Sequence, residues 1–129
     1  MISPIALYIY HTITKHFRIN YNNRYKVVID YPYGHYEGTG YLDSGNKLIS
    51  PFSGSPIVLV EKEYIEYHKL KLLPVPYHAL NYSGIISCFK PDKLLINGKE
   101  TNNVLIGLSE VRFNIDGITI LLNARMEDL

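Results

Sequence analysis

The feature that most constrains this chain is a succession of short apolar runs, each closed by a turn signal, which begins near residue 25. Short runs rich in β-branched and aromatic residues, bounded by glycine, proline or asparagine, predict strands. Such runs are expected at residues 25–31, 36–42, 47–49, 57–60, 85–89, 93–96 and 104–108. This pattern predicts an all-β domain of mostly antiparallel strands.

Turn signals add detail to this expectation. The Asn-Gly pair at 97–98 predicts a tight hairpin, because both residues tolerate positive φ. The Asp-Gly pair at 116–117 predicts a last hairpin, in which residues 110–115 pair with residues 118–123. Residues 61–70 contain neither glycine nor proline and predict the one short helix of this domain.

The composition fits one globular domain and excludes several function classes. The chain has 129 residues, 47% of them hydrophobic and 19% charged, with a formal net charge of +1. No basic stripe is present, so a nucleic-acid partner is not expected. Cys88 is the single cysteine, which excludes an internal disulfide. It lies in the apolar run 85–89, where a small buried side chain is expected rather than a reactive thiol.

The N-terminal residues 1–19 are expected to be separate from the main domain, which we place at residues 20–129. Residues 2–10 are nearly all apolar and are followed by basic side chains, but a bilayer crossing takes about 20 residues. Two interpretations stay open: a short element packed on the core, or the cytoplasmic end of a longer membrane helix.

Two kinds of site find little support. The five histidines never pair at ligand spacing on one element and no cysteine cluster assists them, so neither a metal nor a cofactor is expected. No Gly-x-Ser-x-Gly elbow supports a serine nucleophile.

The strongest candidate for chemistry is the Asp-Ser-Gly-Asn sequence that follows the predicted strand 36–42. An aspartic protease needs this order, because the strand holds Asp43 rigidly and the hydroxyl of Ser44 can anchor the loop. Gly45 lets a backbone N–H approach the carboxylate and stabilise its ionised form. Asp-Ser-Gly also makes ordinary turns, so the triplet alone favours a turn.

A second apolar run raises the catalytic interpretation. Residues 104–107 end in Gly107, and in pepsin-like and retroviral-type proteases such a run passes behind the active-site loop. We therefore expect Ile106 and Gly107 to form the core behind Asp43. The alternative is a plain buried strand that ends in a turn glycine.

Several linked motifs between about residues 25 and 123 resemble the sporulation sigma-E factor processing peptidase family. They are Leu42-Asp43-Ser44-Gly45-Asn46-x-Leu48, Pro51-x-x-Gly54-x-Pro56-Ile57, Val75-Pro76-Tyr77, Phe89-Lys90-Pro91-Asp92 and Val104-Leu105-Ile106-Gly107-Leu108-Ser109. Asn46 distinguishes this group from retroviral proteases, which more often have alanine there. Ser50 is a departure, since family members often have aspartate before the proline.

The resemblance implies a membrane-associated aspartic endopeptidase of spore-forming bacteria, whose cytoplasmic domain is retropepsin-like and self-associates. It would remove the pro-segment from an inactive sigma factor at the inner face of the cell membrane. The family's bundle of membrane helices is not in this sequence, and residues 1–19 would be its remnant. The expected fold is one half of a closed, retropepsin-like β-barrel, active as a homodimer.

One Asp-Ser-Gly triplet is half an active site, so two chains are expected to meet at Asp43. Ser44 would brace the two loops against each other. The hairpin 76–89 is the candidate flap over the substrate, with Asn81, Tyr82, Ser83 and Gly84 at its tip. The competing hypothesis is a non-catalytic retropepsin-like module that dimerises or holds an extended peptide by strand addition. A generic β-barrel binding domain is a third.

Overall fold

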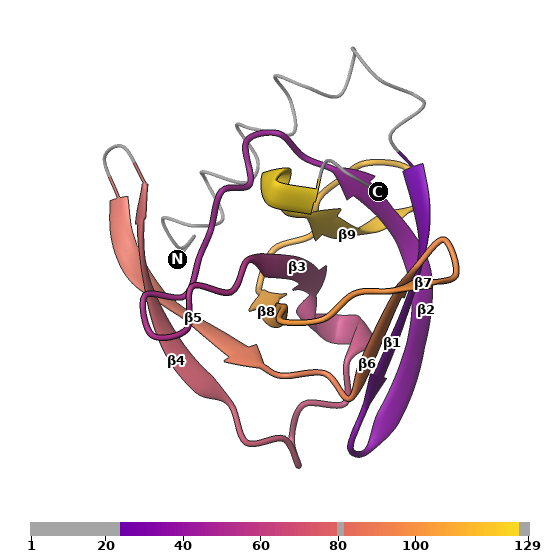
Figure 1. The fold of residues 1–129 in the computed structure, drawn as a ribbon, viewed down its shortest axis with the longest axis horizontal. Coiled ribbons are helices and arrows are strands. Elements are labelled where there is room, and N and C mark those ends of the chain that lie inside the picture. The colour runs from indigo at the N-terminus through magenta and orange to yellow at the C-terminus, as the bar shows by residue number, and fades with distance from the viewer. Residues whose placement is uncertain (1–23, 80–81, 127–129) are drawn as a thin grey trace.

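A single sheet of nine strands makes up most of the computed structural model, which describes residues 24–79 and 82–126 (Figure 1). Across the sheet the strand order is β4-β5-β8-β3-β9-β2-β1-β6-β7. The elements in chain order are β1 (Arg24–Tyr31), β2 (Gly34–Leu42), β3 (Ile57–Glu61), the 3-10 turn η1 (Lys62–Tyr64), β4 (Leu73–Ala79), β5 (Tyr82–Phe89), β6 (Lys93–Ile96), β7 (Lys99–Glu100), β8 (Leu105–Ser109), β9 (Ile118–Leu122) and the 3-10 turn η2 (Ala124–Met126).

The described strands form an open sheet, so the expectation of a closed barrel was wrong. β4 and β7 stand at opposite ends of the strand order and do not pair with each other. The ring centroids of Tyr31 in β1 and Phe89 in β5 nevertheless lie 5.6 Å apart. This contact shows that the sheet curls strongly. Curling encloses apolar side chains without joining the edges by hydrogen bonds.

The centre of the sheet is buried on both faces. Every residue of β3 and of β8 is buried, and the two strands run parallel with Ile57 opposite Leu105. Leu59 packs into one apolar cluster, whereas Val58 packs into a second cluster together with β1 and β6. The continuous apolar runs at 57–60 and 104–108 are typical of strands in this position, and both predictions are confirmed.

Most of the other predicted strands are present, with ends shifted by a few residues. The Asn-Gly hairpin is confirmed between β6 and β7, with φ of 50° at Asn97 and 82° at Gly98. The run at 47–49 was expected as a strand, but it forms only an isolated bridge between Ile49 and Pro56.

The helix predicted at residues 61–70 is wrong, since only η1 is helical there. Glu61 still belongs to β3, and its carboxylate accepts a hydrogen bond of 3.1 Å from the N–H of Phe113. Ile65 is buried with an extended backbone. Docking these two side chains into the sheet overrides the local helical pattern.

The hairpin predicted around residues 116–117 is also wrong. Residues 110–115 contain no strand, and β9 pairs with β2 in parallel and with β3 in antiparallel fashion. The turn itself exists, because the N–H of Ile118 donates to the carbonyl of Ile115 at 3.0 Å. This turn feeds β9 into the middle of the sheet, where both its faces are covered.

Cys88 is buried, and burial raises the pKa of its thiol to about 12, as expected of an unreactive side chain. Residues 1–19 and the boundary at residue 20 lie outside the described residues. Within the described ranges no helix is long and apolar enough to cross a membrane.

Candidate active site

Asp43 lies where two parallel strands end together. β2 and β9 pair in parallel up to Leu42 and Leu122, and the N–H of Asp43 donates to the carbonyl of Leu122 at 3.3 Å. The side chains at the ends of such strands are held by the sheet rather than by a loose loop. Asp43 is only 2% exposed, so its carboxyl group is held in the protein rather than in bulk water.

The turn after Asp43 points a backbone donor at the carboxylate. The N–H of Gly45 donates to Oδ1 of Asp43 at 2.9 Å, and the N–H of Asn46 donates to the carbonyl oxygen of Asp43 at 3.0 Å. A backbone N–H bound to the carboxylate favours its ionised form. Ser44, between Asp43 and Gly45, is exposed.

Asn46 ties this turn to the centre of the sheet. Its buried side-chain amide donates to the carbonyl of Ile57 at 3.2 Å and to that of Leu121 at 3.4 Å. Its Oδ1 accepts the N–H of Leu48 at 3.3 Å. One side chain therefore connects the Asp43 turn with β3 and β9.

Asn123 is a second anchor that sequence reasoning missed. It follows β9 and is completely buried, and its amide donates to the carbonyls of Leu48 at 2.7 Å and Ile57 at 3.2 Å. The only signal in the sequence is a polar residue at the end of the apolar run 118–122. Asn46 and Asn123 both donate to the carbonyl of Ile57. Asn123 therefore supports the same turn as Asn46.

The phenol of Tyr41 is affected by the charge of Asp43. Burial raises the pKa of its phenol, and the charge of Asp43 raises that pKa further. Tyr41 and Asp43 therefore lie close enough for their charges to interact. In the described part of the chain no group of three or more histidine, cysteine or acidic side chains could hold a metal.

Ile106 and Gly107 lie in β8, and Ile106 is completely buried. A Cβ added at Gly107 would lie nearest to side-chain atoms of Ile86, Ile57 and Leu59. The nearest neighbours of Gly107 therefore belong to β3 and β5. A side chain added at position 107 would therefore act on the Asp43 turn through Ile57.

The hairpin predicted as the candidate flap is present as β4–β5, which projects from the body of the sheet (Figure 1). Its predicted tip needs correction. Ser83 and Gly84 are paired in β5, opposite His78 and Tyr77, and Tyr82 pairs with Ala79. The connection falls at residues 80–81, so Asn81 lies outside the described residues.

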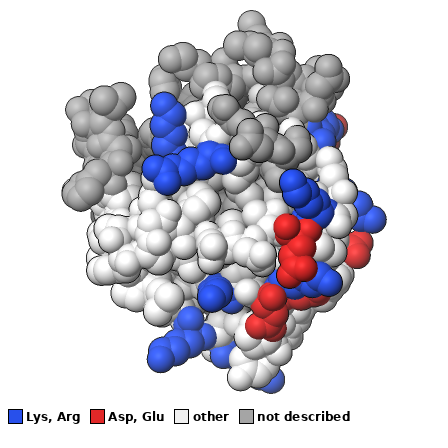
Figure 2. All heavy atoms as spheres, in the orientation of Figure 1, with Lys and Arg blue, Asp and Glu red and all other residues white. Residues whose placement is uncertain are grey.

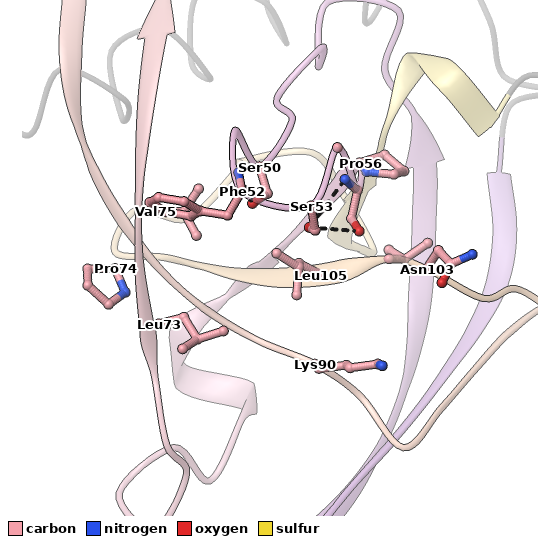
Figure 3. A pocket seen from close by; sticks show the side chains of 13 residues that line it. Ser50, Phe52, Ser53, Pro56, Leu73, Pro74, Val75, Lys90, Asn103 and Leu105 are labelled. Atoms are coloured by element: carbon pink, nitrogen blue, oxygen red, sulfur yellow. Dashed lines mark hydrogen bonds between the residues drawn. The ribbon is translucent and has the colours of Figure 1, made fainter.

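A groove of about 980 Å³ opens beside the loop that continues from the Asp43 turn (Figure 3). Three segments and one side chain line it: Ser50 with residues 52–56, the first residues of β4, residues 103–105 and Lys90. The face seen in Figure 2 carries mixed acidic and basic side chains along one side and few charges over its centre.

Comparison with known proteins gives one result for this chain. The family model described as peptidase U4, sporulation factor SpoIIGA, matches residues 1–126. No curated protein and no solved structure matches the chain.

Proposed function

Because the chain belongs to the sporulation factor SpoIIGA family of peptidases, we propose that it is an aspartic endopeptidase in which Asp43 supplies one of two catalytic carboxylates. The family match confirms the resemblance to sigma-E factor processing peptidases. Membership makes this a sporulation-related peptidase; the aspartic mechanism, the paired chain and the sigma factor substrate are the proposal.

The observation that carries the proposal is the geometry around Asp43. Its carboxylate is buried at the end of two strands and accepts the N–H of Gly45 at 2.9 Å. The buried amides of Asn46 and Asn123 fix the turn to the sheet. An ordinary surface turn needs neither a buried carboxylate nor two buried asparagines. Such an arrangement suits catalysis, because the reacting group is held in place before the substrate arrives.

A homodimer completes the site, because the chain contains a single Asp-Ser-Gly triplet. A two-fold axis between the two Asp43 side chains would place the same surface of each chain against the other. Ser44 is exposed beside Asp43, so its hydroxyl is available to brace the loop of the partner chain.

Two carboxylates a few ångströms apart cannot both ionise, so the Asp43 pair would share one proton. The ionised member would take a proton from a water molecule as that water attacks the scissile carbonyl. The protonated member would donate a hydrogen bond to the carbonyl oxygen. The two apparent pKa values would belong to the pair rather than to either chain.

Other parts of the chain have roles in the same reaction. The β4–β5 hairpin is the flap that closes over the bound peptide, and the substrate is the precursor of a sporulation sigma factor. Residues 1–19 connect the domain to the inner face of the cell membrane.

The sheet edges do not favour the competing idea of a module that binds peptides by strand addition. β4 carries Pro74 and Pro76, which lack the N–H that an added strand would use. β7 contains only Lys99 and Glu100, and short charged edges resist pairing. No observation favours a generic β-barrel binding domain.

The test is the Asp43→Asn variant, incubated with a sigma factor precursor while loss of the pro-segment is followed on a gel. Asparagine keeps the shape and can still accept the N–H of Gly45, but it removes the shared proton. Cleavage should be abolished with little change in melting temperature. Asp116→Asn is the matched control, since Asp116 is an exposed turn aspartate. Undiminished processing by Asp43→Asn would refute the mechanism.

A further inference from the structure

The groove beside the Asp43 loop has the composition of a binding site. Its lining is mainly apolar and includes the buried side chains of Val75, Val104 and Leu105. Phe52 and Leu73 also line it, and they are 78% and 45% exposed. Large side chains exposed together around one hollow mark a surface that binds another molecule.

The described residues that line the groove carry a single charge. Among them Lys90 is the one charged residue, and it is exposed at the side formed by residues 103–105 (Figure 3). None of the carboxylates among residues 24–79 and 82–126 forms an ion pair with it. An anionic group on an apolar ligand would therefore complement both features of the groove.

The loop 50–56 connects the groove with the candidate active site along the chain. The loop 50–56 begins just after Leu48, whose N–H is bound to Asn46 of the catalytic turn. At its other end, Pro56 accepts the N–H of Leu105 in the floor of the groove, and the next residue, Ile57, accepts the amides that hold the turn. The segment that follows Asp43 therefore forms both the turn of the candidate active site and one wall of the groove.

Resting on the proposed peptidase activity, we infer that the groove binds the substrate polypeptide on one side of the scissile bond. A large apolar side chain of the substrate fills the space next to Phe52 and Leu73. An aspartate or glutamate two residues away pairs with Lys90, because alternate side chains of an extended peptide lie on the same face. Lys90 is thus a residue that determines specificity, and the favoured substrates are apolar segments with acidic neighbours.

The experiment measures binding apart from cleavage. Fluorescein-labelled peptides with the core Glu-Ser-Leu-Ser-Glu, and the same core with glutamine or lysine in place of both glutamates, are titrated with the full chain and with its Asp43→Asn variant. Fluorescence anisotropy should show the glutamate peptide binding about three- to fivefold tighter than the glutamine peptide, as expected for an exposed ion pair.

Three further variants locate the effect. Lys90→Glu should remove the preference for glutamate and favour the lysine peptide. Lys99→Glu makes the same charge change in β7, away from the groove lining, and should leave the preference unchanged. Phe52→Ala should weaken all three peptides alike, because it removes apolar contact and no charge.

The outcomes separate this inference from the proposed function. A glutamate preference that depends on Lys90, with no cleavage by the unmodified chain, supports the groove and refutes the peptidase mechanism. Cleavage that depends on Asp43, with peptide binding indifferent to Lys90→Glu, supports the mechanism and overturns the groove assignment. A Lys90→Glu effect on sedimentation alone would make this surface a contact between copies and would also overturn it.

Discussion

Replacing Gly107 by alanine should damage both the core and the site. The added Cβ would lie 2.8 Å from Cδ1 of Ile86 and 2.9 Å from Cγ2 of Ile57. The Cδ1 atom ends a flexible side chain and can rotate away. Cγ2 of Ile57 is attached next to the backbone of a fully buried residue, so β3 itself must move. Overpacking of this kind costs about 1–3 kcal/mol.

Movement of β3 would reach the turn of Asp43, the proposed catalytic residue. The carbonyl of Ile57 accepts the amides of Asn46 and Asn123, both at 3.2 Å, so displacing it loosens both anchors. Small displacements of a reacting group slow a reaction strongly, and we expect the rate of cleavage to fall by about tenfold or more.

The control is Gly98→Ala in the β6–β7 turn. Gly98 has φ of +82° with no atom within 4 Å of an added Cβ, so alanine there is strained but touches nothing. The strain costs about 1–2 kcal/mol, which is similar to the overpacking cost. With a urea m-value of about 1–3 kcal/mol/M, both midpoints should fall by roughly 1 M. Only Gly107→Ala should slow cleavage of the precursor. A destabilised Gly107→Ala protein that cleaves at the normal rate would refute the path through Ile57.

Three other changes have defined outcomes. Burial raises the pKa of Glu61, so the folded chain holds this proton to higher pH than the unfolded chain, and the melting temperature should fall as pH rises above about 4.5. Glu61→Gln should flatten that part of the profile, and an unchanged slope would exclude this group. Asn123→Leu removes two donors to backbone carbonyls and should lower the free energy of urea unfolding by about 1–3 kcal/mol; a smaller loss would mean that Asn46 holds the turn alone. Ser44→Ala should weaken dimers in sedimentation while Ser44→Thr keeps them, and equal behaviour of the two would exclude the brace.

Local patterns predicted the pieces whose environment is written in a few neighbouring residues. The apolar runs at 57–60 and 104–108 are continuous and contain β-branched residues, and this is enough to identify buried strands. The Asn-Gly turn at 97–98 needs only its own two residues. The approach of the Gly45 N–H to Asp43 follows from three adjacent residues.

Long-range pairing decided the rest. Residues 61–70 have a helical pattern, but contacts of Glu61 with Phe113, far along the chain, hold them extended or in turns. β9 looked like half of a hairpin, yet its partners are β2 and β3. The role of Asn123 depends on the position of β9 in the sheet, which places Asn123 beside Leu48. An open rather than closed sheet likewise depends on edge strands that no local pattern describes.

The central claim is that each chain holds half of the active site, and mixing subunits tests it most directly. Unmodified chain and Asp43→Asn are combined in equal amounts, allowed to exchange, and assayed for removal of the pro-segment at constant total protein. If two Asp43 carboxylates from two chains form one site, mixed dimers are inactive and about one quarter of the original rate remains. If each chain cleaves by itself, about one half remains. A shared site thus leaves one quarter of the rate, and a remaining rate of one half would contradict it.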